Sequence, residues 1–218
     1  MIVLIDLGGV FDMNKYFILV ACLFSFAVNA SQKAITDEGE VVLLSPNGTW
    51  SYESDGSEKP EISMSKTAFK KPESASFTLK SKVNKSAFAL DPKAWSFKKG
   101  EYPGHEYGFT LNGSDVYAMA ITEGLEIGLS YLGEIALMNA QAEYSDMKIV
   151  QQEYRNVNGA EVLYMEMAGT AMGMSLVMFG YYYSNESGST QLVAYTGSNV
   201  APKYKSEIAA FLNGLVLQ

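Results

Sequence analysis

Cysteine, histidine and arginine are almost missing from this chain of 218 residues. Cys22 is the only cysteine, which excludes a disulfide framework and a cysteine-rich metal site. His105 is the only histidine, so paired-histidine metal sites and the HExxH zinc motif are excluded too. It lies in the turn-like Tyr102–Glu106 segment, which is typical of an ordinary loop residue.

Catalytic motifs are also missing. The chain has no GxxxxGK[ST] phosphate loop, no GxGxxG that opens a helix and no GxSxG nucleophile turn. We therefore predict no catalytic residue and no cofactor, and we expect a protein that is not an enzyme. A pair of carboxylates suited to hydrolysis is defined by the distance between them in the folded protein and not by their separation in the sequence. An enzyme with an unrecognised carboxylate site therefore stays as an alternative.

Acidic residues outnumber basic ones, and the formal net charge is −8. This balance argues against nucleic acid as a partner, because phosphate binding needs clustered lysine and arginine. The charge is unevenly spread, however. Residues 66–99 carry nine lysines against two acidic residues, whereas residues 100–218 carry four basic and thirteen acidic residues. The lysine-rich segment indicates a weak contact with an anionic membrane surface, as an alternative to a solvated strand and linker.

The first thirty residues have the pattern of a signal peptide. Lys15 precedes a mostly apolar run at 16–28, and Val28-Asn29-Ala30 fits a cleavage site. We expect translation to start at Met13, with Met1 as the alternative start, and an exported periplasmic or secreted protein. Leu19-Val20-Ala21-Cys22 also has the form of a lipoprotein processing site, so a lipid anchor on Cys22 is the minority interpretation.

We predict four segments: upstream residues and signal peptide at 1–30, a β-hairpin module at 31–53, a flexible linker at 54–75 and an α+β domain at 76–218. In the module, Pro46-Asn47-Gly48 is turn chemistry between two short apolar strands. The module resembles an NGTW hairpin element of exported bacterial proteins. Trp50 and Tyr52 are a possible interaction surface there, or cover the hairpin's own apolar face.

The main domain is predicted to hold an antiparallel sheet packed by two main helices. Helices are expected at 125–142 and 201–215. Strands are expected at 77–82, 95–98, 107–111, 116–122, 147–155, 161–168, 174–183 and 190–196, separated by Gly- and Asn-containing turns.

This order of elements resembles the PsbP-like α/β/α sandwich superfamily. Short patterns at 153–159, 181–184 and 211–215 also resemble uncharacterised exported bacterial proteins. The resemblance covers roughly residues 76–218. It implies an accessory, assembly or binding protein, and it carries over no active site.

Arg155 is the chain's single arginine, beside fifteen lysines. A lone guanidinium points to a specific bidentate role. We predict an ion pair with Glu134 between sheet and helix; an anchor for an anionic ligand and a plain surface arginine are the alternatives.

Five methionines lie between Met165 and Met178. The weak metal candidates among them are Met165, Met167, Met172 and Met174, because thioethers suit Cu(I). Packing in the core is the competing interpretation, since flexible methionine fills gaps between sheet and helix. Taken together, the sequence favours an exported, non-enzymatic binding or accessory protein whose partner is a protein or an envelope component. A protein that binds Cu(I) or a small ligand through these methionines or Arg155 is the alternative.

Overall fold

A computed structural model describes residues 32–35, 41–45, 47–52, 62–102 and 104–217. The predicted signal segment and Cys22 lie outside the described residues. Within them, neither helix has the length and hydropathy needed to cross a membrane.

The N-terminal strands form a small sheet of their own. Strand β2 (Val41–Leu44) pairs antiparallel with β1 (Gln32–Ile35) on one side and with β3 (Trp50–Tyr52) on the other. Gly48, with φ +82°, makes the turn between β2 and β3 that the Asn-Gly pair predicts. Val42 on the central strand is buried.

The main sheet has eight strands in the order β4-β10-β11-β12-β13-β9-β8-β7. Their bounds are β4 (Met64–Phe69), β7 (Trp95–Lys99), β8 (His105–Leu111), β9 (Tyr117–Glu123), β10 (Lys148–Val157), β11 (Ala160–Ala171), β12 (Met174–Asn185) and β13 (Gly188–Gly197). The long strands β10 to β13 follow one another as antiparallel hairpins. Asn158 and Gly159, both with positive φ, form the two-residue turn between β10 and β11.

Strand β4 corrects the predicted boundaries. The segment 54–75 was predicted to be a flexible linker, yet its residues 64–69 are an edge strand of the main sheet. Met64 faces Tyr154 and Phe69 faces Val157 in a parallel pair, so the sheet is not wholly antiparallel either. Apolar and polar residues alternate only weakly in Met64–Phe69, because most of this edge strand is exposed. The Ser- and Lys-rich composition of the segment favoured the prediction of a linker instead.

A second small sheet has β6 (Ser86–Leu90) at its centre, between β5 (Phe77–Lys80) and β14 (Leu215–Leu217). The sequence did not predict β6, whose five residues are all buried and show no alternation. It also assigned residue 215 to the last helix. That helix ends at Leu212 because Gly214 lies against β6, where any Cβ would meet the Ala89 carbonyl oxygen.

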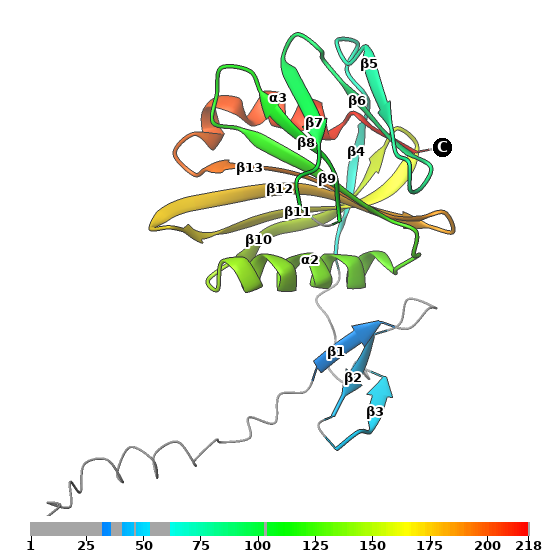
Figure 1. Ribbon diagram of the computed structural model, residues 1–218. Helices are drawn as coiled ribbons and strands as arrows, with labels where there is room; N and C mark the ends of the chain where they lie inside the picture. The colour runs from blue at the N-terminus through cyan, green and yellow to red at the C-terminus, as the bar shows by residue number, and fades with distance from the viewer. Residues whose placement is uncertain (1–31, 36–40, 46, 53–61, 103, 218) are drawn as a thin grey trace, which may run out of the picture.

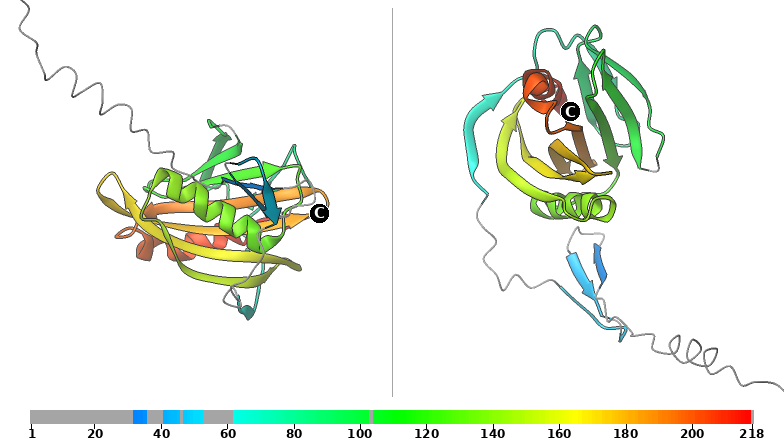
Figure 2. Two further views of the ribbon diagram at one scale, coloured as in Figure 1. Left: turned by 90° about the horizontal axis from the view of Figure 1, so that it is seen from below. Right: turned by 90° about the vertical axis from the view of Figure 1, so that its left-hand side faces the viewer.

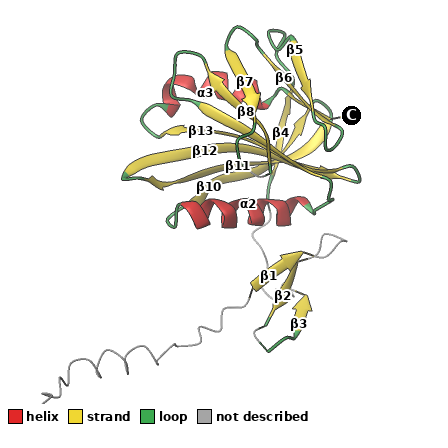
Figure 3. Ribbon diagram, viewed as in Figure 1, coloured by secondary structure: helices red, strands yellow, loops and turns green. Residues whose placement is uncertain are grey.

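Two helices cover opposite faces of the main sheet. Helix α2 (Leu129–Glu143) lies below the sheet and α3 (Ala201–Leu212) above it, as Figures 1 and 3 show. The sheet curves around α3, so that its two edges stand on either side of that helix (Figure 2). The small sheet packs on the same side as α3. The predicted α+β class is confirmed.

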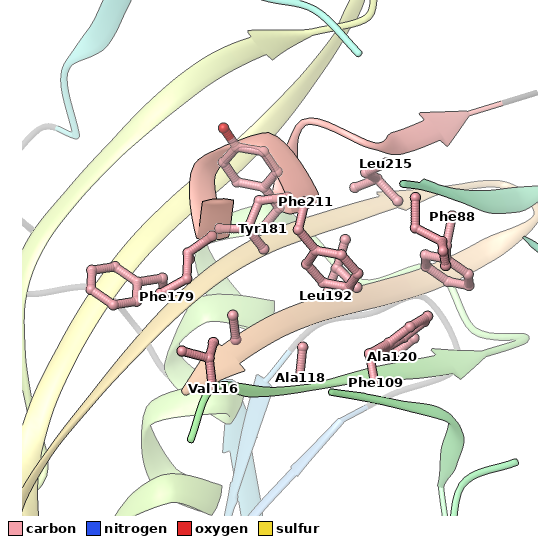
Figure 4. Packing of buried hydrophobic residues seen from close by; sticks show 14 of the residues in the cluster. Phe88, Phe109, Val116, Ala118, Ala120, Phe179, Tyr181, Leu192, Phe211 and Leu215 are labelled. Atoms are coloured by element: carbon pink, nitrogen blue, oxygen red, sulfur yellow. The ribbon is translucent and has the colours of Figure 1, made fainter. Parts of the chain in front are cut away.

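Each face of the sheet has its own hydrophobic core. On the α3 side, Phe211 packs with Phe109 and Trp95, and Figure 4 shows it among side chains of several strands. On the α2 side, Leu132 and Ala136 pack on Leu163 and Met165. Gly133 allows this close approach, because a Cβ there would lie 2.6 Å from Leu163.

Tyr182 lies wholly buried in the core under α2. Its hydroxyl is the one buried side-chain polar atom in the described residues that has no hydrogen-bond partner, and burial raises its pKa. Because a buried hydroxyl without a partner loses its hydration, we expect Tyr182→Phe to raise the free energy of unfolding by about 1 kcal/mol in urea denaturation.

The neighbouring Tyr181 is the matched control for that substitution. Its hydroxyl donates to Asn213 Oδ1 at 2.8 Å and accepts from Arg155. Tyr181→Phe should therefore lower the free energy of unfolding by about 1 kcal/mol. Equal losses in both variants would contradict the assignment of an unpartnered Tyr182 hydroxyl.

Candidate functional site

Arg155 lies on the α3 face of β10, two residues from Glu153. Alternate residues of a strand point to the same face, so these two side chains lie next to each other on β10. Arg155 Nε and Nη2 both lie 2.7 Å from Glu153 Oε1. Nη1 donates to the Tyr181 hydroxyl at 3.3 Å. The guanidinium is therefore held from two directions by groups of its own sheet.

Three aromatic rings lie around the guanidinium, those of Tyr164, Phe69 and, further away, Tyr181. Its central carbon lies 3.4 Å from the ring centroid of Tyr164 and 4.6 Å from that of Phe69 on β4. Such cation–π contacts gain strength where water is excluded. Burial alone would lower the pKa of Arg155, but the hydrogen bonds to Tyr181 and Glu153 outweigh it and raise the pKa. The Arg155 guanidinium therefore stays charged. Its contact with Phe69 helps to hold β4 on the sheet.

Asn158 completes this junction at the turn after β10. Its φ of +53° is a left-handed conformation that asparagine tolerates. Its Oδ1 accepts from the Lys71 amide at 2.7 Å, and its Nδ2 donates to the carbonyls of Asn213 and Leu215. One side chain therefore ties the segment after β4 to the C-terminal strand. We call Arg155, Glu153, Tyr164, Phe69 and Asn158 the Arg155 junction.

The predicted partner of Arg155 was wrong. Glu134 is on helix α2, which packs on the opposite face of the sheet from Arg155. The residue that pairs with the guanidinium is Glu153. The Arg155 side chain is 15% exposed, and its ion pair lies within the sheet rather than between sheet and helix.

The four methionine candidates are not brought together. Met165 and Met167 are sealed in the core under α2, whereas Met172 and Met174 are exposed at the tip of the β11–β12 hairpin. Met174 pairs with Ala171, six residues along β11 from Met165, which is about 20 Å at the rise of a strand. One copper ion cannot bind these thioethers together, and Met165, Met167 and Met178 are core residues, as the packing interpretation predicted.

The lysine-rich segment carries an exposed pair of aromatic rings. Phe77 on β5 and Phe97 on β7 stack at 5.4 Å between centroids and are 40% and 44% exposed. Lys99 follows Phe97 by two residues on β7 and so points to the same face of that strand, and Lys80 follows Phe77 by three residues on β5; both lysines are exposed. We call Phe77, Phe97, Lys80 and Lys99 the β5–β7 surface.

Nearby carboxylates are engaged with other groups. Glu106 accepts hydrogen bonds from the Ser81 and Thr122 hydroxyls at 2.7 and 2.6 Å and from the Lys82 amide at 2.6 Å. Glu101 pairs with Lys98 at 2.6 Å. The Glu106 bonds fix the turn after β5 on strands β8 and β9, so the β5–β7 surface is held by the main sheet.

The other proposed interaction surface lies on β3. Trp50 faces Leu44 and Tyr52 faces Val42 across the β2–β3 pair. Trp50 is 58% exposed, which leaves much of its ring accessible. A role in recognition for these two residues stays a prediction.

Sequence reasoning missed the stacked pair of Phe77 and Phe97. Both residues lie on predicted strands in the lysine-rich segment. The contact itself joins two different sheets, and no periodicity within one strand reports such a contact. At the Arg155 junction, by contrast, the sequence does contain a signal for the ion pair. In Glu153-Tyr154-Arg155 the two charged residues are two positions apart, which on a strand places both side chains on one face.

No family model and no curated protein matches the chain. Among solved structures, the chain is similar to PsbP of the cyanobacterium Synechocystis, with a TM-score of 0.48 and 15% identity over 65% of this chain and 92% of that one. It is also similar to LpqN of Mycobacterium tuberculosis, described as involved in cell envelope biogenesis (TM-score 0.44, 11% identity, 62% and 83% covered). A Pseudomonas aeruginosa protein of unknown function, described as a putative regulator, is similar as well (TM-score 0.42, 10% identity, 61% and 91% covered). All three TM-scores lie below 0.5, and the PsbP-like resemblance stays a prediction.

Proposed function

We propose that this protein is an exported accessory protein that works by binding, and that it docks on an anionic membrane surface through the β5–β7 surface. The signal-peptide pattern at 13–30 supports export. The single observation that carries the docking is the exposed Phe77–Phe97 stack on the two strands that also carry Lys80 and Lys99.

The lysines and the phenylalanines contribute two different interactions with the membrane, one electrostatic and one hydrophobic. Each lysine near an anionic bilayer contributes about 1 kcal/mol of attraction, which salt weakens. Phenylalanine rings gain free energy when they enter the boundary between headgroups and acyl chains. Residues 77–99 hold six lysines and one acidic residue, while residues 100–218 hold four basic and thirteen acidic residues, so the attraction to an anionic bilayer is expected of the lysine-rich segment.

Vesicle co-sedimentation tests the electrostatic term. We expect binding to vesicles with an anionic phospholipid, and none to vesicles of zwitterionic lipid alone. Lys80→Glu/Lys99→Glu should weaken binding about 100-fold, because two reversed charges remove and oppose the attraction. The matched control is Lys148→Glu/Lys205→Glu, which changes the net charge equally at two other exposed lysines and should bind almost as wild type.

The aromatic term is tested separately by Phe77→Ser/Phe97→Ser, which keeps all charges. Binding should weaken about tenfold or more and should lose its resistance to high salt. If both double variants bind vesicles as tightly as wild type, the membrane proposal is wrong. Capture of a protein by the intact surface, without vesicle binding, would also overturn it in favour of a protein partner.

A further inference from the structure

Helix α2 is apolar on its outer side as well as on the side that faces the sheet. Only two of its fifteen residues, Glu134 and Glu143, are charged. A helix that is apolar all round is usually buried on every side. The main sheet covers only one side of α2, as Figure 1 shows. The composition of α2 therefore indicates that another part of the molecule packs on its outer side.

An apolar stripe runs along that outer side. Tyr131, Ile135, Met138 and Ala142 follow one another at spacings of four, three and four residues, which is the seam spacing of helices that pack on a partner. Tyr131 and Ile135 are half-buried, while Met138 is 44% exposed and Ala142 is also exposed. We call these four residues the α2 stripe. It offers a partner an uncharged surface.

The small sheet of strands β1, β2 and β3, which we call the β1–β3 module, has an apolar face of its own. Residues that pair across an antiparallel sheet share a face, so Val42, Leu44, Trp50 and Tyr52 lie together. Val42 is buried, but Leu44 is 38% and Trp50 58% exposed. So few and such short strands gain stability when their hydrophobic face packs against a helix.

The chain itself brings these two apolar surfaces close together. Residues 53–61 connect β3 to the main domain, and nine residues reach at most about 30 Å. The next residue, Ile62, packs in the core on the α2 side of the sheet. Figures 1 and 2 show the strands of the β1–β3 module on the outer side of α2. So short a connection keeps the module at a high effective concentration beside the α2 stripe.

We propose that the β1–β3 module docks on the α2 stripe, with Leu44 and Trp50 as its main apolar contacts. The occupant is this chain's own module, because the module is tethered on the correct side of the sheet and is too small to bury its own apolar face. This docking gives Trp50 and Tyr52 a partner within the same molecule. It uses no side chain of the β5–β7 surface, so it does not depend on membrane binding.

Cross-linking tests the contact in the full chain. Cys22→Ser removes the only thiol, and Leu44→Cys with Met138→Cys then places one thiol on each surface. With a short bismaleimide at low protein concentration, we expect a cross-link within one chain, measured by intact mass. The control pairs Leu44→Cys with Ala209→Cys, an exposed position of α3 on the opposite side of the sheet, and should react at least about tenfold more slowly.

Two outcomes of the cross-linking overturn the proposal. Equal rates for the two cysteine pairs would mean that the β1–β3 module does not dock on α2. Cross-links that join two chains instead of two positions of one chain would make a second copy of the protein the occupant of the α2 stripe.

A charge placed on the α2 stripe tests the same contact without thiols. Met138→Glu should release the module, because burying a carboxylate against apolar groups is unfavourable. Trp95 is 4% exposed, so acrylamide quenching of tryptophan fluorescence reports mainly on Trp50. We expect Met138→Glu to raise the quenching constant about twofold. Met172→Glu, at the exposed tip of the β11–β12 hairpin, should leave it unchanged. Equal quenching constants in the two variants, with circular dichroism as in wild type, would contradict the proposal.

Discussion

Arg155→Met is expected to lower the free energy of unfolding by about 3 kcal/mol. The substitution leaves Glu153 without its cation and the Tyr181 hydroxyl without its donor. Removing one member of a largely buried pair costs several kcal/mol, because the remaining charge is desolvated and unpaired. The space between Tyr164 and Phe69 is also refilled by a side chain without charge, so both cation–π contacts are lost. Urea denaturation with linear extrapolation measures the effect.

Two further variants separate charge from geometry at the Arg155 junction. Arg155→Lys keeps the charge but loses the planar group and the two contacts to Glu153, so about half of the destabilisation should remain. Lys148→Met removes an exposed cation from the same strand and should cost less than about 0.5 kcal/mol. A loss for Arg155→Met as small as that for Lys148→Met would show that the junction contributes nothing to stability.

Phe211→Ala should have the largest effect, a loss of about 4 kcal/mol in the free energy of unfolding. The ring is 3% exposed and contacts Trp95 and Phe109 from helix α3. Truncation removes the transfer free energy of the ring and leaves a cavity that the surrounding strands cannot close. The loss of two aromatic contacts adds about 1 kcal/mol within this total.

Phe77→Ala is the matched control, since it removes the same atoms from a ring that is 40% exposed. It should cost about 1 kcal/mol or less, mainly the stacking on Phe97. Similar losses for Phe211→Ala and Phe77→Ala would mean that α3 is not packed on the sheet as described. The midpoint of thermal unfolding provides an independent check on the same pair.

The regions that were predicted well are those in which one strand or helix carries its own signal. Strands β10 to β13 alternate or are richly apolar, and turns such as Asn158-Gly159 separate them. The predicted helix at 125–142 starts four residues early, because Gly128 and the residues before it form the entry to α2 rather than part of it. Local patterns were sufficient for these elements.

The regions that were missed depend on contacts between distant parts of the chain. Strand β4 is exposed and polar, and only pairing with β10 makes it a strand. Strand β14 is three residues long and exists because Gly214 allows the chain to cross Ala89. The choice of Glu134 for Arg155 failed for the same reason, since it required knowing which face of the sheet each residue occupies. Charge and spacing alone do not report that.

The parallel pairing of β4 with β10 also sets an order of events during folding. Met64 faces Tyr154, which is ninety positions later in the chain, whereas β10 to β13 pair with their immediate neighbours. Contacts between near neighbours form quickly, and those between distant segments form slowly. During synthesis β4 is made early but can pair only after β10 has been made. We therefore expect the Arg155 junction to close late, as the step that joins the first strand of the domain to the last.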